Sequence, residues 1–256
     1  REVEHQKIFQ KLWTNYTLDE YKKERLTRYI KRIKINNLSK LIKGKKIIDF
    51  GCGHGNFLIS CHAFKPKYCL GIDYGADSIK YANKIRNQLK IDKKYVNFIN
   101  RAVYSSGQKD NSFDFAIQNG VFHHLDNETK AYKEVYRVLK KNGYFWLYTD
   151  GGGGIRDMIV NMSQNILSKI DKNTVIDQIR SMGLDSNKEY FLGDNLNALY
   201  RQTNIPDLKK MLKKIGFKEF KQMNGGYNND YDKPFSKDKF FTQKFGSGDI
   251  RMLCKK

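Results

Sequence analysis

The chain has 256 residues, of which 39% are apolar and 13% aromatic, and its 48 basic and 27 acidic side chains give a net charge of +21. This length fits one domain with insertions, and the apolar content suffices for a core, which excludes a wholly disordered chain. No stretch approaches the roughly 20 consecutive apolar residues of a membrane span, so none is expected. The four scattered cysteines include no C-x-x-C pair, which favours reduced thiols and a cytoplasmic location.

The positive charge is concentrated at the two ends of the chain. Residues 1–46 carry 14 basic and 5 acidic side chains, and residues 205–256 carry 13 and 6. The basic residues are 37 Lys and only 11 Arg, beside 22 Asn and 23 Ile, a bias that codons rich in A and T produce irrespective of function. Arg, whose planar guanidinium suits phosphate recognition, is scarce. Two interpretations stay open: a solvated Lys-rich surface, or a surface for a polyanion such as RNA.

The first predicted helix covers residues 22–35. Its apolar side chains recur at the i, i+3, i+4, i+7 spacing of one helical face, at Leu26, Tyr29, Ile30 and Ile33, and the rest of the segment is basic. A short second helix is expected to end at Gly44. Residues 1–44 are therefore expected to form a helical extension ahead of the main domain.

From Lys46 onward, apolar strands alternate with helices. Strands are predicted at 46–50, 68–73, 95–100, 113–118 and 143–149, and helices at 56–64, 76–89 and 128–140. This alternation indicates an α/β fold with a mostly parallel sheet and helices on both faces. After four consecutive glycines at 151–154, residues 155–204 look like helical pieces. A helix opened by Pro206 and ended by Gly216, and strands near 217–222 and 249–254, complete the chain.

The segment Ile47–Phe57, IIDFGCGHGNF, carries the most chemical information. Asp49 ends a buried strand, and three glycines at alternate positions precede a helix. Glycines permit backbone torsions closed to other residues and let a ligand approach the main chain, while the helix presents free N–H groups. The dinucleotide fingerprint needs a small residue where Asn56 stands, which argues against NAD or FAD.

Asp73 is the second chemical signal, because it ends the next strand in GIDYGADSIKYA. A carboxylate at the end of the second strand lies beside the first strand and can accept hydrogen bonds from both hydroxyls of a ribose. The alternative is an ordinary helix cap. Tyr74 follows, where its ring can lie against a purine or pack at the rim of the domain.

Four segments in order, IIDFGCGHG, GIDYGADSIKYA, SFDFAIQNGVFHHL and RVLKKNGYFWLYT, resemble the motifs of class I S-adenosylmethionine-dependent methyltransferases. The resemblance covers residues 45–150 and extends more weakly to 205–222 and to the final GDIRMLCKK. It implies a Rossmann-like, doubly wound, mostly parallel seven-stranded sheet with an antiparallel terminal strand. It also implies a methyltransferase domain at 45–256, a helical lid at 1–44, and a substrate-pocket insertion at 151–204.

The resemblance also implies the cofactor, S-adenosyl-L-methionine, with S-adenosyl-L-homocysteine as its product. It assigns the methionine moiety to the first strand and glycine loop, at Asp49, Gly51, Cys52, Gly53 and Gly55. It assigns the ribose to Asp73 and the flank of the adenine to Tyr74. Where the family often has an Asp-Ala pair that reads adenine, this chain has Asn100, Arg101 and Ala102. Gln118 and Asn119 fall next to the sulfonium. Trp13 and Tyr16 of the lid can close over the cofactor or can instead join the lid to the core.

The segment after the fourth predicted strand bears on the acceptor. Enzymes that methylate base amines or glutamine amides usually carry an Asn/Asp-Pro-Pro-aromatic tetrad there, and this chain has QNGV followed by FHHL. The FHHL form resembles methyltransferases of small molecules. The catalytic metal ligands of catechol-type enzymes are not evident, so no metal is expected. A small-molecule acceptor, methylated on O or N, is therefore predicted, and an RNA methyltransferase that uses the basic ends is the alternative.

Three residues are candidates for a general base: His123, His124 and Asp150. Methyl transfer needs an aligned nucleophile in a dry site, and a base only when the acceptor must lose a proton. The two histidines are adjacent, so at most one is expected to point into the site, and both can instead pack or cap the following helix. Asp150 ends a strand where open α/β sheets bind ligands, and a turn-forming role is its alternative.

Overall fold

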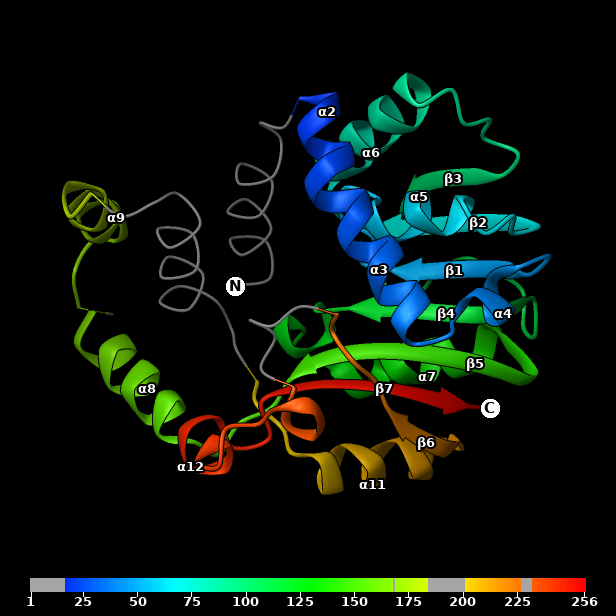
Figure 1. Ribbon diagram of the computed structural model, residues 1–256. Helices are drawn as coiled ribbons and strands as arrows, with labels where there is room; N and C mark the ends of the chain where they lie inside the picture. The colour runs from blue at the N-terminus through cyan, green and yellow to red at the C-terminus, as the bar shows by residue number, and fades with distance from the viewer. Residues whose placement is uncertain (1–16, 168, 184–200, 227–231) are drawn as a thin grey trace.

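The computed structural model describes residues 17–167, 169–183, 201–226 and 232–256 (Figure 1). Trp13 and Tyr16, the predicted lid aromatics, lie outside the described residues. None of the described helices is long and apolar enough to cross a membrane.

Seven strands form one sheet in the order β3-β2-β1-β4-β5-β7-β6. β7 is antiparallel to both of its neighbours, and the pairs among the first five strands are parallel. The strands are β1 (Lys46–Phe50), β2 (Tyr68–Asp73), β3 (Val96–Asn100), β4 (Phe113–Asn119), β5 (Leu139–Asp150), β6 (Lys218–Gln222) and β7 (Asp249–Lys255). The predicted doubly wound sheet with an antiparallel terminal strand is confirmed, and its order reverses between β1 and β4.

Helices cover both faces of this sheet (Figure 1). Buried apolar residues of the N-terminal helices, α5 and α6 form one core cluster, and those of α7 and α11 form a second cluster. The first group comprises α2 (Leu18–Glu20), the π-helical η1 (Tyr21–Leu26), α3 (Thr27–Ile35), α4 (Ser39–Ile42), α5 (Asn56–His62) and α6 (Ala76–Gln88). The second group comprises α7 (Glu128–Val138) and α11 (Ile205–Ile215). The remaining helices are η2 (Phe122–His124), α8 (Ile155–Leu167), α9 (Lys172–Ser181), η3 (Lys233–Phe235) and α12 (Phe241–Phe245).

The N-terminal helical run begins earlier than predicted, at Leu18, because Thr17 and Glu20 form a reciprocal capping box. From the predicted apolar stripe, Ile33 is fully buried and Tyr29 is partly buried against the first core cluster. Arg32, on the basic face of the predicted helix, is also buried. Residues 17–42 therefore pack into the same core as β1 and α5.

The boundary between α7 and β5 differs from the prediction. The helix ends at Val138, and β5 begins at Leu139 rather than at residue 143. Leu139 adopts an extended conformation and pairs with Phe113, with a register irregularity before the next paired residues. Its side chain is buried, as it would also be in a last helical turn, so the apolar periodicity does not separate the two conformations.

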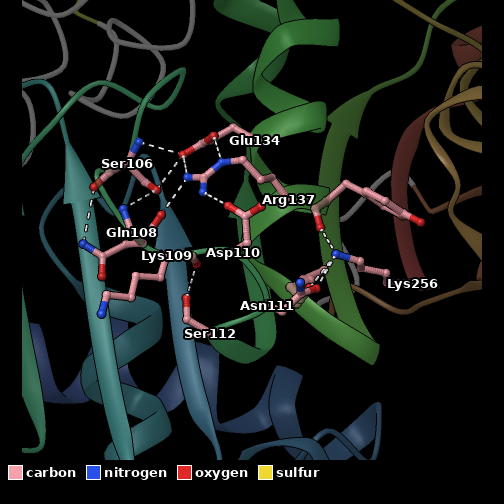
Figure 2. Close-up of polar contacts among 11 residues, drawn as sticks. Ser106, Gln108, Lys109, Asp110, Asn111, Ser112, Glu134, Arg137 and Lys256 are labelled. Atoms are coloured by element: carbon pink, nitrogen blue, oxygen red, sulfur yellow. Dashed lines mark hydrogen bonds and ion pairs between the residues drawn. The ribbon is translucent and has the colours of Figure 1, made fainter.

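A polar network anchors the loop after β3 to α7 (Figure 2). The backbone N–H and hydroxyl of Ser106 donate to Glu134 Oε1 at 2.8 and 2.6 Å. Arg137 donates to the same carboxylate, to the carbonyl of Gln108 and to Asp110. Burial alone would raise the pKa of Glu134, but the hydrogen bonds from Arg137 and Ser106 outweigh it and lower that pKa. The network anchors residues 106–110 of this loop to α7.

Candidate active site

A cavity of about 480 Å³ lies at the edge of the sheet where β1, β2 and β4 end. Its walls come from the N-terminal helix, the loop after β1, the end of β2, the loop after β3, the end of β4, and η2. This is the point where the strand order reverses, and open α/β sheets bind ligands there. The volume is in the usual range for small-molecule sites.

The three glycines after β1 have two different roles. All have positive φ, between +51° and +76°. A Cβ atom on Gly51 would lie 2.6 Å from a methyl of Val121, and one on Gly55 would lie 2.5 Å from the ring of Phe98, so these two glycines allow close packing. A Cβ on Gly53 would meet nothing within 4 Å. Gly53 is therefore the residue whose backbone faces open cavity, and Gly55 does not line the cavity.

Asp73 projects from the end of β2 into the cavity. Its two carboxylate oxygens accept hydrogen bonds from the N–H groups of Gly53 and Gly75, at 2.9 and 2.8 Å. Burial raises the pKa of Asp73, and these two hydrogen bonds offset part of that rise. Each oxygen retains a further lone-pair site, so the group can still accept bonds from two ligand hydroxyls. The two backbone N–H groups fix the orientation of the carboxylate at the cavity wall.

Buried polar atoms lie at the glycine-loop end of the cavity and behind its wall. Asp49 Oδ1, His54 Nε2 and Asn56 Oδ1 are buried and have no hydrogen-bond partner within the described residues. Burial, and then the charge of Asp73, raises the pKa of Asp49. Burial and the nearby positive Arg25 lower the pKa of His54 to about 4, so its imidazole is neutral at pH 7. His54 and Asn56 line the cavity, while Asp49 lies behind its wall.

Cys52 also lines the cavity, between Gly51 and Gly53. It is buried, and burial raises the pKa of its thiol. A raised pKa keeps the sulfur protonated at neutral pH, so Cys52 acts as a small apolar part of the wall.

The predicted adenine-side residues separate into two groups. Tyr74 and Ala102 line the cavity, and Tyr74 is 63% exposed. Asn100 Nδ2 instead donates to the carbonyls of Asp73 and Tyr74, at 2.9 and 2.7 Å, and the backbone N–H of Arg101 donates to the carbonyl of Asp73. Neither Asn100 nor Arg101 is part of the lining. Their contacts hold the ends of β2 and β3 together.

The end of β4 places Asn119 at the cavity and Gln118 away from it. Gln118 is buried and accepts a hydrogen bond from the N–H of Tyr148 at 3.1 Å. Asn119 Oδ1 accepts hydrogen bonds from Arg32 Nη1 and Trp146 Nε1, each at 3.3 Å. Asn119 Nδ2 donates to the Tyr29 hydroxyl at 3.4 Å. Segments distant in sequence therefore meet around one amide.

Of the three candidate bases, His124 alone lines the cavity. His123 is buried, with its ring centroid 3.9 Å from that of His124 and its Nδ1 3.4 Å from the hydroxyl of Thr149. Asp150 is buried at the end of β5, and its carbonyl accepts from the N–H of Thr203. Among the described residues, no group of three His, Cys, Asp or Glu side chains is placed to hold a metal ion.

The sequence predicts an N-terminal helical lid at 1–44, but it does not single out the two residues of this region that line the cavity. Arg25 and Tyr29, one helical turn apart, both line the cavity. In the sequence, Tyr29 is one member of an apolar stripe and Arg25 is one charge in a basic helix. The available signal is their i, i+4 spacing, which places the two side chains on one face.

The sheet order, the glycine loop and the carboxylate at the end of β2 together define an α/β domain of the class I methyltransferase type. Residues 41–188, more than half of the chain, match a family model described as a methyltransferase domain. The chain therefore belongs to the class I S-adenosylmethionine-dependent methyltransferases, and S-adenosylmethionine is the cofactor of this family.

Sequence relatives cover only part of the chain. An uncharacterized methyltransferase, YcgJ, from Bacillus subtilis is 30% identical over 104 residues, which are 40% of this chain and 39% of that protein. Sterol methyltransferase-like 3 from Botryococcus braunii is 30% identical over 115 residues, 45% of this chain and 29% of that protein. The matched part thus spans well under half the length of these relatives.

Solved structures match over most of the fold. The B. subtilis YcgJ structure has a TM-score of 0.57 at 16% identity, covering 87% of this chain and 97% of that one. A possible histamine N-methyltransferase from Thermotoga maritima has a TM-score of 0.55 at 19% identity, covering 97% and 98%. Likeness at such low identity establishes the shared fold and leaves the acceptor open.

Proposed function

We propose that this chain transfers the methyl group of S-adenosylmethionine to an oxygen or nitrogen atom of a small-molecule acceptor by in-line displacement. The observation that carries the proposal is the carboxylate of Asp73, fixed by two backbone N–H groups at the edge of a cavity that continues to Asn119 and His124. A ribose held at Asp73 directs the rest of the cofactor along the glycine loop towards the end of β4.

The residues present fit this cofactor. Asp73 would accept the ribose hydroxyls, Tyr74 and Ala102 would flank the base, and the backbone at Gly53 would allow the chain of the ligand to pass. The unpartnered atoms of His54 and Asn56 would meet the polar end of the methionine moiety. When bound, the cofactor supplies an electrophilic methyl group on a positively charged sulfur.

The protein contributes position and a water-poor environment. Tyr29 and Asn119 fix the wall at the end of β4, while Val121 and Leu125 supply apolar surface there. Alignment of reactants can account for several kcal/mol of a lowered barrier, about 7–11 in the best intramolecular cases. His124, at the cavity wall, is the described residue placed to take a proton from an acceptor that carries one.

Two features favour a small acceptor over RNA. The proposed acceptor end lies within a cavity rather than on an open surface, and its QNGV and FHHL segments lack the tetrad that base-amine methyltransferases carry. Both relatives described above are named as methyltransferases, and the name of one specifies a sterol-type enzyme. The basic ends of the chain are then a solvated surface.

Incubation of the protein with methyl-labelled S-adenosylmethionine and a host-cell extract, with and without ribonuclease, tests this proposal. We expect label in a nuclease-resistant, low-molecular-weight fraction. Label that disappears with ribonuclease would contradict the small-molecule assignment. Absence of both labelling and cofactor binding would contradict methyl transfer itself.

A further inference from the structure

The helix α8 presents its apolar face to solvent. Five large side chains at the i, i+3, i+4, i+7, i+11 spacing of one helical face are each 56–65% exposed: Ile155, Met158, Ile159, Met162 and Ile166. The buried residue of the helix is instead the charged Asp157. A surface helix of a globular protein normally has the opposite arrangement, with its apolar face against the core.

The hydrogen bonds of Asp157 fix the rotation of α8 about its own axis. Its carboxylate accepts from the N–H groups of Gly153 and Gly154, at 2.7 and 3.0 Å, and from the side-chain amide of Gln202 at 2.7 Å. At about 100° per residue, the five apolar side chains lie roughly 100–200° around the helix from Asp157. Because Asp157 is held against the domain, the apolar face points away from it.

The start of α8 is locked against the segment that contains α12 (Figure 1). The N–H of Gly151 donates to the carbonyl of Gly248 at 2.7 Å. A Cβ atom on Gly154 would lie 2.5 Å from backbone atoms of Lys244 and Phe245, so this close approach requires a glycine. The exposed face of α8 and the chain that leads through α12 are therefore neighbours on the surface.

Residues 233–244, which lead into α12, combine exposed aromatic and basic side chains. Phe235 and Phe240 are 50% and 51% exposed. Of the twelve large apolar side chains that are exposed among the described residues, seven lie in α8 or in this segment, so they form a patch. The one acidic residue of the segment, Asp238, accepts a hydrogen bond from Lys244 at 2.7 Å. The exposed basic residues of the segment are Lys233, Lys237, Lys239 and Lys244.

The lysines beside the apolar patch indicate which partner it fits. Large exposed apolar patches mark sites of contact with proteins or membranes. A second copy of this chain would bring a further net charge of +21 to the same surface, which opposes pairing. An anionic lipid bilayer offers an apolar layer for the Ile, Met and Phe side chains and negative headgroups for the lysines.

We propose that α8 and residues 233–244 bind reversibly to the surface of an anionic lipid bilayer. In the bound state α8 lies in the plane of the interface, with its apolar face toward the acyl chains and the lysines among the headgroups. Because α8 follows β5, which is parallel to β4, this surface lies at the same edge of the sheet as the cavity. The inference does not depend on the methyl acceptor, and it gives one part of the basic C-terminal end a partner.

Sedimentation of the full chain with lipid vesicles tests this inference. One set of vesicles contains phosphatidylcholine alone, and the other contains equal parts of phosphatidylcholine and phosphatidylserine. We expect the chain to bind the anionic vesicles at least about 10-fold more tightly than the neutral ones, and more weakly as the salt concentration rises. Absence of binding to the anionic vesicles, or equal binding to both sets, would overturn the inference.

A double variant, Met158→Gln with Met162→Gln, removes apolar surface from the middle of α8 and keeps good helix formers there. We expect its affinity for anionic vesicles to fall about 10-fold or more. The matched control, Ile35→Gln with Tyr95→Gln, removes exposed apolar side chains of α3 and of the loop before β3, and should bind as the native chain does. Unchanged binding by the α8 variant, or an equal loss in the control, would overturn the assignment.

Sedimentation velocity without vesicles separates the bilayer from a second copy of the chain as the occupant of this surface. We expect the native chain and the α8 double variant to have the same oligomeric state. A dimer that the substitutions at Met158 and Met162 abolish would assign the face to self-association and overturn the bilayer assignment. Both double variants should unfold at the temperature of the native chain, because all four replaced side chains are exposed.

Discussion

The two walls of the cavity are built in different ways. The wall that we propose holds the cofactor, here called the cofactor wall, consists of short segments that each follow a strand. Backbone N–H groups and glycine torsions set its shape around Asp73. The wall at the end of β4, proposed to face the acceptor and here called the acceptor wall, includes Tyr29 and Asn119 from distant parts of the sequence. Arg32 and Trp146, behind this wall, hydrogen-bond to Asn119. The first wall is fixed by local chain geometry, and the second by long-range hydrogen bonds.

This difference explains what each wall contributes to function. A wall made of backbone groups depends little on most side chains, so many methyltransferases with different acceptors can share it. A wall made of side chains from remote segments can change its chemistry by single substitutions. Substitutions on the first wall should therefore affect cofactor binding, and substitutions on the second should affect transfer.

The largest effect is expected for Asp73→Ala. It removes the group proposed to accept hydrogen bonds from two ribose hydroxyls, and hydrogen bonds to a charged group are each worth about 1.5–3 kcal/mol. S-adenosylhomocysteine affinity, measured by calorimetry, should fall about 100- to 10,000-fold. Asp77→Ala, an exposed carboxylate on the adjacent helix, should bind normally. An unchanged dissociation constant in Asp73→Ala would remove the ribose assignment.

Gly53 and Gly55 should differ when each is replaced by Ala. Gly55→Ala forces a Cβ to within 2.5 Å of Phe98 at a positive φ, and overpacking plus backbone strain should lower the free energy of unfolding by about 3–4 kcal/mol. Gly53→Ala has open space and should cost only the strain, about 1–2 kcal/mol. It should nevertheless weaken cofactor binding, because the new methyl stands in the cavity. Denaturant titrations measure the stability loss of each variant, and calorimetry measures its cofactor affinity. Equal stability losses would contradict the different packing around the two glycines.

His54 should make the cofactor wall sensitive to acid. Its pKa is about 4 in the folded chain against an ordinary 6.5, so below pH 6.5 the unfolded chain gains a proton that the folded chain does not. Stability should therefore fall as the pH drops from about 6.5 to 4, by up to about 3 kcal/mol from this group. The raised pKa values of Asp49 and Asp73 act in the opposite direction over the acid range.

The His54→Gln variant separates these contributions, since both carboxylates remain. The difference in unfolding free energy between the native chain and His54→Gln should change with pH across this window and be constant above it. A difference that does not depend on pH would show that His54 titrates normally in the folded chain.

The smallest effect is expected for Asn100→Ala. Loss of its two hydrogen bonds to backbone carbonyls at an exposed site should reduce stability by about 1 kcal/mol and cofactor affinity a few-fold. If Asn100 only joins β2 to β3, the variant should retain the preference of the native chain for S-adenosylhomocysteine over its inosine analogue. Loss of this preference would instead show that Asn100 recognises the adenine ring.

The residues of the cofactor wall can be predicted from the sequence because they belong to local motifs. The glycines, Asp49 and Asp73 occur at strand ends whose positions follow from apolar runs, and parallel strands bring those ends to one edge. The sheet order and its antiparallel last strand follow from the resemblance to the family. The predicted start of β5 is wrong because Leu139 is buried both as a helical and as a strand residue.

The residues of the acceptor wall cannot be predicted in this way, because their contacts join segments that are far apart in the sequence. Arg32 looks like a surface charge in a basic helix, and only the folded chain shows it buried between Asn119 and Gly225. Of the predicted bases, His124 reaches the cavity, while His123 and Asp150 make other contacts. Adjacent positions in a short 3₁₀ turn such as η2 face different directions, which the sequence alone does not resolve.

The most direct test of the central claim is a comparison of ligands on the native chain. Calorimetric titrations with S-adenosylhomocysteine, NAD and ATP should show binding of S-adenosylhomocysteine at one site, with NAD and ATP at least about 100-fold weaker, a difference of about 2.7 kcal/mol. Such a result would support a methyltransferase cofactor site at the end of β1, β2 and β4. Equal or tighter binding of NAD or ATP, or no binding of S-adenosylhomocysteine, would contradict it.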